Sequence, residues 1–121
     1  MDARVAALNE EITRHGSGNI VAANFSDGIL TYRISKVKEA FLSTQAYELI
    51  LALTKCPEVR RTHIDLSDCR VVSSLELTLI GYIAVQTRFH GGGTRIICPS
   101  AVNRRALNLA GFDKLSEVVE N

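Results

Sequence analysis

Hydrophobic and polar positions follow two different periods along this chain, and the change between them predicts the fold. Two short segments, residues 20–25 and 29–34, have the length and apolar content of β-strands. The turn between them contains Asp27-Gly28, and Asp-Gly is a strong β-hairpin signal. From residue 38 onward the apolar residues recur at helical spacing, which predicts a helix over 38–54 that ends before Pro57.

The rest of the chain alternates between strands and helices. Two short apolar segments predict strands at 62–66 and 94–98. Two longer segments predict helices at 75–89 and 101–110. Gly111 is well placed to stop the last helix, and a short strand is expected within 115–119.

The first residues predict an additional element. Val5, Leu8 and Ile12 recur at helical spacing among polar residues, so residues 1–18 are expected to form an amphipathic helix and a linker. This helix either packs on the domain that follows, residues 19–121, or forms a homodimer contact. Its apolar stripe is too short for a coiled coil by itself.

A hairpin followed by alternating helices and strands predicts an α/β fold. We expect a mixed sheet of four or five strands, with helices mainly on one face and the N-terminal helix added to it. The side chains expected in the core are Leu66, Leu77, Ile80, Ile83, Ala84, Ile96 and Leu109.

Composition narrows the functional classes. The chain has 121 residues and a net charge of +1, which gives no overall attraction to nucleic acid or to anionic lipid. No apolar run approaches the roughly 20 residues that span a bilayer, and the N-terminus lacks an apolar signal core, so a cytoplasmic protein is expected. The three cysteines and three histidines are scattered, which favours reduced, buried thiols and predicts neither a metal site nor a cofactor.

The chemistry that stands out is a pair of serines before the 75–89 helix. Ser73-x-x-Glu76 has the spacing of a capping box, with Ser73 as N-cap and Glu76 reaching back to its backbone N–H. This places Ser74 at the first helical position, where free N–H groups and the helix dipole favour an anion. On these residues alone, the serines act either only as a cap or also as a phosphorylation switch.

The residues around this pair resemble a known family. Residues 64–79, I-D-L-S-D-C-R-V-V-S-S-L-E-L-T-L, are similar to the phosphorylation segment of STAS domains, the family of bacterial anti-sigma factor antagonists. The similarity continues through the glycine turn and strand at 91–98, and through 100–105 to Gly111-Phe112. The resemblance implies a STAS-like fold.

The resemblance also assigns roles by register. Ser74 aligns with the family's phosphorylated serine, and Ser73 is the weaker candidate. Ser73 stands where the family most often has aspartate, and Glu76 where glycine is common. An aspartate at position 73 is therefore expected to be tolerated. Ser74 would lie at the centre of a partner-binding surface, because Thr78 and Gly81, one turn on, are small and leave room.

Three functions compete. The leading one is a non-enzymatic interaction switch: the resemblance implies binding to a serine-kinase anti-sigma factor, regulation by phosphorylation at Ser74, and resetting by a PP2C-type phosphatase. The alternative is a non-phosphorylated STAS scaffold subunit in a larger assembly of the stressosome or lipid-transport type. A small-ligand binder is the third, but the glycines at 91–93 lack the ending of a phosphate loop.

Other polar residues predict no catalytic site. Asp65 and Asp68 could form a carboxylate pair, but no base, nucleophile or metal-ligand set accompanies them. Arg104 and Arg105 are expected on a solvated helix face, with contact to an acidic partner as the other interpretation.

Overall fold

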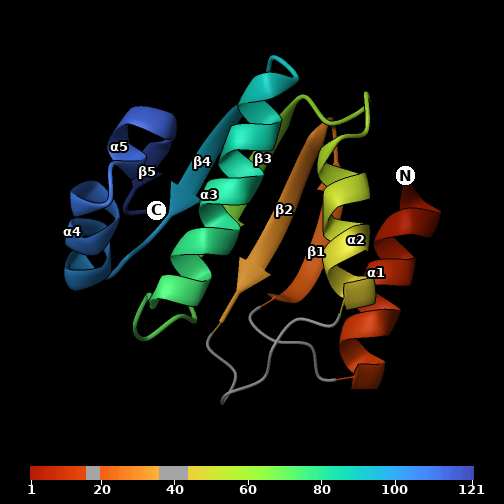
Figure 1. The fold of residues 1–121 in the computed structure, drawn as a ribbon, viewed down its shortest axis with the longest axis horizontal. Helices are drawn as coiled ribbons and strands as arrows, with labels where there is room; N and C mark the ends of the chain where they lie inside the picture. Colours follow the sequence, from red (N-terminus) through yellow and green to blue (C-terminus); the bar gives the residue numbers. More distant parts are fainter. Residues whose placement is uncertain (16–19, 36–43) are drawn as a thin grey trace.

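The computed structural model describes the backbone of residues 1–15, 20–35 and 44–121, and the side chains of the same residues except 15, 20 and 21. In chain order the elements are α1 (Asp2–His15), β1 (Ile20–Ser26), β2 (Ile29–Ile34), α2 (Thr44–Thr54), β3 (Arg61–Asp65), α3 (Ser74–Phe89), β4 (Gly93–Ile97), α4 (Ala101–Leu109), α5 (Phe112–Leu115) and β5 (Glu117–Val119) (Figure 1). The linker expected between the N-terminal helix and residue 19, and the start of the helix expected from residue 38, lie outside the described residues.

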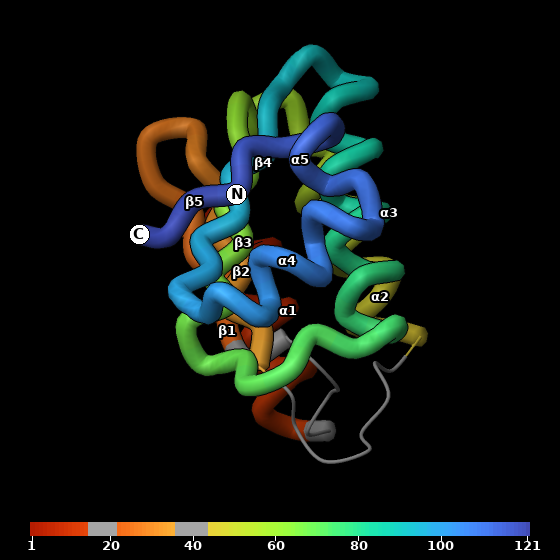
Figure 2. Tube along the Cα trace, turned by 90° about the vertical axis from the view of Figure 1, so that its left-hand side faces the viewer, coloured from red at the N-terminus to blue at the C-terminus, as the bar shows by residue number. Residues whose placement is uncertain are grey.

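The five strands form one mixed sheet in the order β1-β2-β3-β4-β5. Only β1 and β2 are antiparallel, and their hairpin turn has positive φ at both Asp27 and Gly28, as an Asp-Gly turn of this type requires. The other neighbouring strands are parallel. Helices α2 and α3 cover one face of the sheet, and the view from the side separates them from the strands (Figure 2). The expected α/β fold is confirmed.

Side chains alternate between the covered and the open face of the sheet. On β2 the residues Leu30, Tyr32 and Ile34 are fully buried under the helices. The buried Tyr32 hydroxyl lies 2.9 Å from the Thr54 hydroxyl and donates to the Ile50 carbonyl of α2 at 3.2 Å. Because buried polar groups need partners, these bonds fix how α2 sits on the sheet.

The predicted core is largely confirmed, with one error. Leu66, Ile80, Ile83, Ala84 and Ile96 are buried, at 0–1% exposure.

Leu77 is only partly buried against this core. Leu109, however, is 80% exposed, and Leu107 is buried in its place. Residues two apart on a helix lie on nearly opposite sides, so the prediction chose the wrong face of α4.

Helix α1 packs on its own chain. Leu8 and Ile12 are buried in the core, and Val5 packs against it. The Asn9 amide donates to the Ala23 carbonyl at 2.9 Å and accepts from the Ala23 N–H at 2.8 Å, which satisfies backbone groups of the edge strand β1. The apolar stripe of α1 is thus used within the molecule, and a homodimer contact through this helix would depend on its other side chains.

Candidate functional site at the start of helix α3

The site begins with the loop that leads from β3 to α3. Its first residue, Leu66, donates its N–H to the Ile97 carbonyl of β4 at 2.8 Å. Buried Asn103, on α4, holds the rest of the loop. Its Oδ1 accepts from the Val72 N–H at 3.1 Å, and its Nδ2 donates to the Cys69 carbonyl at 3.0 Å. These bonds position the backbone immediately before Ser73.

Sequence reasoning missed Asn103 as a site residue. It is only 2% exposed, although it lies in a helix with many polar residues. A signal was present, because Asn103 and Leu107 are four residues apart and therefore share one face of α4. A polar residue on the buried face of a helix usually has a structural partner, and here the partner is the loop before Ser73.

Ser73 caps α3 together with Glu76, as predicted. The two residues form a capping box: the Ser73 N–H donates to Glu76 Oε1 at 3.4 Å, and the Ser73 hydroxyl donates to Glu76 Oε2. Glu76 is only 1% exposed, so its carboxylate depends on such bonds for stability. The hydroxyl of Ser73 is consequently engaged in a contact that a phosphate would break.

Ser74 differs from Ser73 in its exposure and in the bonding of its hydroxyl. It is the first residue of α3, its side chain is exposed, and its hydroxyl makes no hydrogen bond within the described part of the chain. One turn on, Thr78 is also exposed and donates its hydroxyl to the Ser74 carbonyl at 2.8 Å. The hydroxyl of Ser74 is therefore open to another molecule, at the helix end that favours an anion.

Gly81 does not provide the space expected of it. A side chain at this position would meet the ring of Phe112 at 3.3 Å. Gly81 thus allows the short helix α5 to pack against α3. Two exposed neighbours of Ser74 in the chain are apolar: Leu75 is 56% exposed and Val71, in the preceding loop, is 58% exposed. An apolar surface beside the free hydroxyl suits contact with another polypeptide.

The remaining polar candidates have local structural roles. Asp65 Oδ1 accepts from the N–H and the hydroxyl of Ser67, at 2.9 and 2.6 Å, while Asp68 lies 3.6 Å from Arg33. These two carboxylates therefore bind separate partners. Arg104 donates to the carbonyls of Cys98 and Pro99 at the end of β4, whereas Arg105 is exposed.

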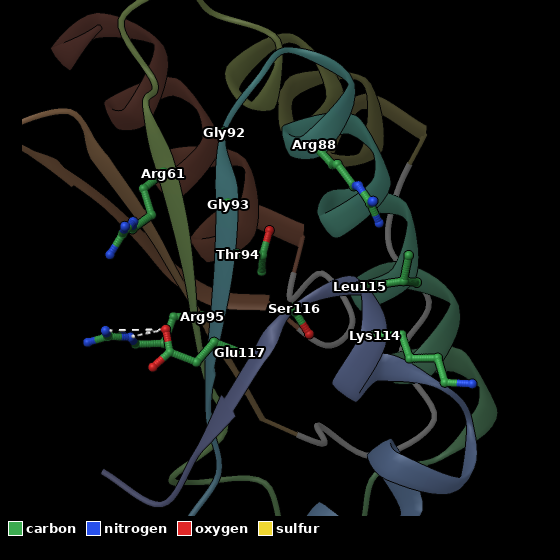
Figure 3. A pocket seen from close by; sticks show the side chains of 10 residues that line it. All are labelled: Arg61, Arg88, Gly92, Gly93, Thr94, Arg95, Lys114, Leu115, Ser116 and Glu117. Atoms are coloured by element: carbon green, nitrogen blue, oxygen red, sulfur yellow. Dashed lines mark hydrogen bonds and ion pairs between the residues drawn. The ribbon is translucent and has the colours of Figure 1, made fainter.

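A surface pocket lies at the other end of the parallel strands from Ser74. It has a volume of about 390 Å³ and lies among Arg61, Arg88, Gly92, Gly93, Thr94, Arg95, Lys114, Leu115, Ser116 and Glu117. Its cations do not converge on one point, because Arg61 and Arg95 point to one side of the sheet and Arg88 and Lys114 to the other (Figure 3). Arg95 is also paired with Glu117 at 3.4 Å. This arrangement does not favour the small-ligand hypothesis.

The open face of the sheet carries a row of polar side chains. Thr31, His63, Arg95 and Glu117 lie in register across β2 to β5. Burial, and then the charges of Arg95 and Arg61, lower the pKa of His63 below its usual 6.5, while Glu117 acts in the opposite direction. His63 Nε2 is buried and finds no hydrogen-bond partner in the described part of the chain. Both observations favour the neutral form of His63.

The cysteines, the potential metal ligands and the length of the helices complete the description of the described residues. The three cysteines are free and buried, as predicted. Burial raises the pKa of the Cys98 thiol, which opposes reactivity. Across residues 1–15, 20–35 and 44–121, no cluster of potential metal ligands is present, and none of the helices has the length and apolar character needed to cross a membrane.

Known structures share this fold. A Thermotoga maritima protein, whose crystal structure is described as that of a candidate anti-sigma factor antagonist, is 15% identical over 82% of this chain and 85% of its own, with a TM-score of 0.64. Its NMR structure gives 19% identity over 82% and 79% of the two chains, with a TM-score of 0.62. An anti-sigma factor antagonist from Mycobacterium paratuberculosis is 20% identical over 82% and 83%, with a TM-score of 0.58.

At this level of identity the similarity establishes a common fold. It is the fold that the resemblance to STAS domains implies. No family model matches the chain. No curated protein matches it at a significant level either.

Proposed function

We propose that this chain is an anti-sigma factor antagonist that works as a phosphorylation-controlled interaction switch. In its unmodified form it binds a serine-kinase anti-sigma factor through the surface around Ser74. The kinase transfers a phosphate to the Ser74 hydroxyl, the complex separates, and a PP2C-type phosphatase restores the serine. The observation that carries this proposal is the contrast between the two serines: the Ser73 hydroxyl is bound to Glu76, while that of Ser74 is exposed and makes no hydrogen bond within the described part of the chain.

The geometry supports switching by repulsion. A phosphate on Ser74 would add roughly −1.5 to −2 charges at neutral pH. The backbone N–H groups of the first turn and the helix dipole stabilise that charge in the free protein, so the fold need not change. At the centre of an interface the same charge would be desolvated against apolar neighbours such as Leu75, which weakens binding.

The role of Glu76 fits this proposal. Its carboxylate is buried and accepts hydrogen bonds from Ser73. Both of its oxygens are therefore directed toward the cap, while the Ser74 side chain is exposed. Glu76 stabilises the turn that presents Ser74 and opposes the phosphate only weakly.

The test is titration of a purified cognate kinase-type anti-sigma factor against three forms of the chain. Ser74→Asp should bind at least about tenfold more weakly than wild type, which corresponds to about 1.4 kcal/mol. Ser74→Ala should bind like wild type and resist inactivation by ATP. Ser26→Asp is the matched control, because Ser26 is exposed at the end of β1 and gains the same charge far from α3.

Mass spectrometry after incubation with the kinase and ATP completes the test. A phosphate should appear on wild type at Ser74 and be absent from Ser74→Ala. If the phosphate is on another residue, or if all forms bind alike, the switch proposal is wrong.

One observation favours the alternative function, a non-phosphorylated scaffold subunit of a stressosome or lipid-transport type of assembly. Ser73 and Glu76 depart from the family pattern at the two positions that flank the phosphoacceptor. A scaffold would need the apolar surface around Leu75 but not the Ser74 hydroxyl. Retained assembly in Ser74→Ala, together with absence of phosphate from wild type in its native cells, would favour this function.

A further inference from the structure

Helix α3 is apolar on its outward side as well as on its buried side. The buried side contains Ile80 and Ile83, which pack on the sheet. The outward side carries an apolar stripe that starts in the preceding loop and continues to the end of the helix. This α3 stripe comprises Val71, Leu75, Thr78, Tyr82, Val85 and Phe89.

Most members of the stripe are far more exposed than a surface helix requires. Leu75 is 56% exposed, Val85 48% and Phe89 82%, and Val71 adds a further 58% exposed side chain. Thr78 uses its hydroxyl within the helix, so the group that it can offer outward is apolar. An exposed apolar surface of this length on one helix indicates an interaction site.

The spacing of the stripe indicates which kind of element covers it. Within the helix, from Leu75 to Phe89, successive members are 3, 4, 3 and 4 residues apart, while Val71 lies in the loop before it. This alternation is the seam of a helix that packs against another helix. From Leu75 to Val85 the order of intervals, 3, 4 and 3, is the same in both directions along the chain. A reversed second copy of α3 therefore matches the first position by position.

In this antiparallel arrangement large and small side chains pair. Leu75 of one copy meets Val85 of the other, Thr78 meets Tyr82, and Phe89 lies toward the loop that carries Val71 of the other copy. Each exposed apolar side chain of the stripe thus finds an apolar counterpart, and the two-fold axis passes beside the middle of α3. No second type of surface is needed to complete the contact.

A phosphate on Ser74 would favour the antiparallel over the parallel arrangement. Ser74 precedes Leu75 and Arg88 precedes Phe89, so both flank the stripe on the same side of the helix. Flanking positions on one side face each other when two helices pair in opposite directions. Ser74 of each copy then faces Arg88 of the other, and Arg88 makes no ion pair within the described part of the chain.

We propose that two copies of this chain associate through antiparallel α3 helices, and that Arg88 of the second copy binds a phosphate on Ser74. The phosphate part rests on the proposed function, whereas the association itself does not. A guanidinium binds a phosphate through charge-assisted hydrogen bonds, and the symmetric dimer contains two such pairs. Phosphorylation would then act twice, because it repels the kinase and also strengthens a dimer that covers the same surface.

The first experiment measures the sedimentation of the purified full chain over a range of concentrations. Wild type should show a concentration-dependent dimer. Val85→Glu should sediment as a monomer, because it places two carboxylates within an apolar seam. Leu109→Glu is the matched control, since Leu109 is 80% exposed on α4 and lies outside the stripe. It should dimerise like wild type.

The second experiment tests the direction of the helices. Ser74→Asp should tighten the dimer by about five- to tenfold, because two surface ion pairs form together. Adding Arg88→Ala should remove this gain and return the dissociation constant to the wild-type range. In a parallel dimer residue 74 would not face Arg88 of the other copy, so Ser74→Asp would not tighten association.

These results separate the two proposals. A wild-type chain that stays monomeric, or a Leu109→Glu variant that dissociates as Val85→Glu does, would overturn the self-association and leave the stripe to another polypeptide. Tightening by Ser74→Asp that persists without Arg88 would overturn the antiparallel arrangement. None of these outcomes depends on the kinase, so the dimer stands or fails apart from phosphorylation.

Discussion

The Ser73–Glu76 pair offers the most direct test of how α3 is held in place. Replacing Ser73 with alanine removes the N-cap, which typically costs about 0.5–2 kcal/mol. It also removes the hydroxyl that donates to the buried Glu76 carboxylate, and a hydrogen bond to a charged group contributes roughly 1.5–3 kcal/mol. The two effects overlap, so we expect Ser73→Ala to lower the free energy of unfolding by about 2–3 kcal/mol.

Ser100 provides a matched control on the same molecule. It is the N-cap of α4, and its hydroxyl accepts from the Asn103 N–H at 3.2 Å, but no carboxylate stands at the third helical position. Ser100→Ala should therefore cost only the ordinary cap, about 1 kcal/mol. Urea unfolding measures both variants. In thermal melts the difference should appear as a midpoint lower by about 3–5 °C per kcal/mol for a domain of this size.

A double-mutant cycle isolates the contact itself. Glu76→Gln keeps the shape of the side chain but removes its charge. In wild type this change should be destabilising. In the Ser73→Ala background it should cost less, because the bond from the Ser73 hydroxyl to the carboxylate is already lost. The expected coupling free energy is about 1–2 kcal/mol. A coupling below about 0.5 kcal/mol, with Ser73→Ala no worse than Ser100→Ala, would refute this account of the cap.

Two further predictions concern the open face and α4. In the folded protein the pKa of His63 is lowered below its unfolded value near 6.5. The free energy of unfolding that depends on neutral His63 is therefore complete above that pH and is lost as the pH falls below it. His63→Gln should reduce the decline of the urea midpoint between about pH 7.5 and 5.5. An unchanged decline would show that His63 titrates normally. Leu107→Ala should cost roughly 2–5 kcal/mol in the same assay, whereas Leu109→Ala should cost less than about 0.5 kcal/mol. Equal losses would mean that α4 is turned differently.

The elements with a clear period were predictable from the sequence. The strands and the 75–89 helix appear within one or two residues of their expected bounds, because long apolar patterns leave few alternatives. The capping box was predictable for the same reason, since its spacing of three residues is set by helix geometry alone. Local rules were sufficient wherever the relevant partners lie close together in the chain.

The errors arise where partners lie far apart in the chain. α4 has only nine residues, and its buried face consists of Leu107 and polar Asn103, so the apolar pattern pointed to Leu109. The Phe112 ring that occupies the space beside Gly81 comes from α5, a four-residue helix too short to produce a period. In both places the deciding contact is tertiary, and one sequence does not show it.

The departures at positions 73 and 76 are best understood as one change. The pattern that Ser73 and Glu76 depart from has a carboxylate at the cap and often a glycine three residues later. Here the carboxylate comes from Glu76, and Ser73 contributes the hydroxyl that donates to it. An aspartate at position 73 could not donate that bond and would place a second carboxylate beside a buried one. From this contact we expect Ser73→Asp to weaken the cap, in contrast to the tolerance that the family pattern suggests. Taken singly, each departure removes a feature of the family's cap, but together Ser73 and Glu76 retain a capped helix start and one carboxylate.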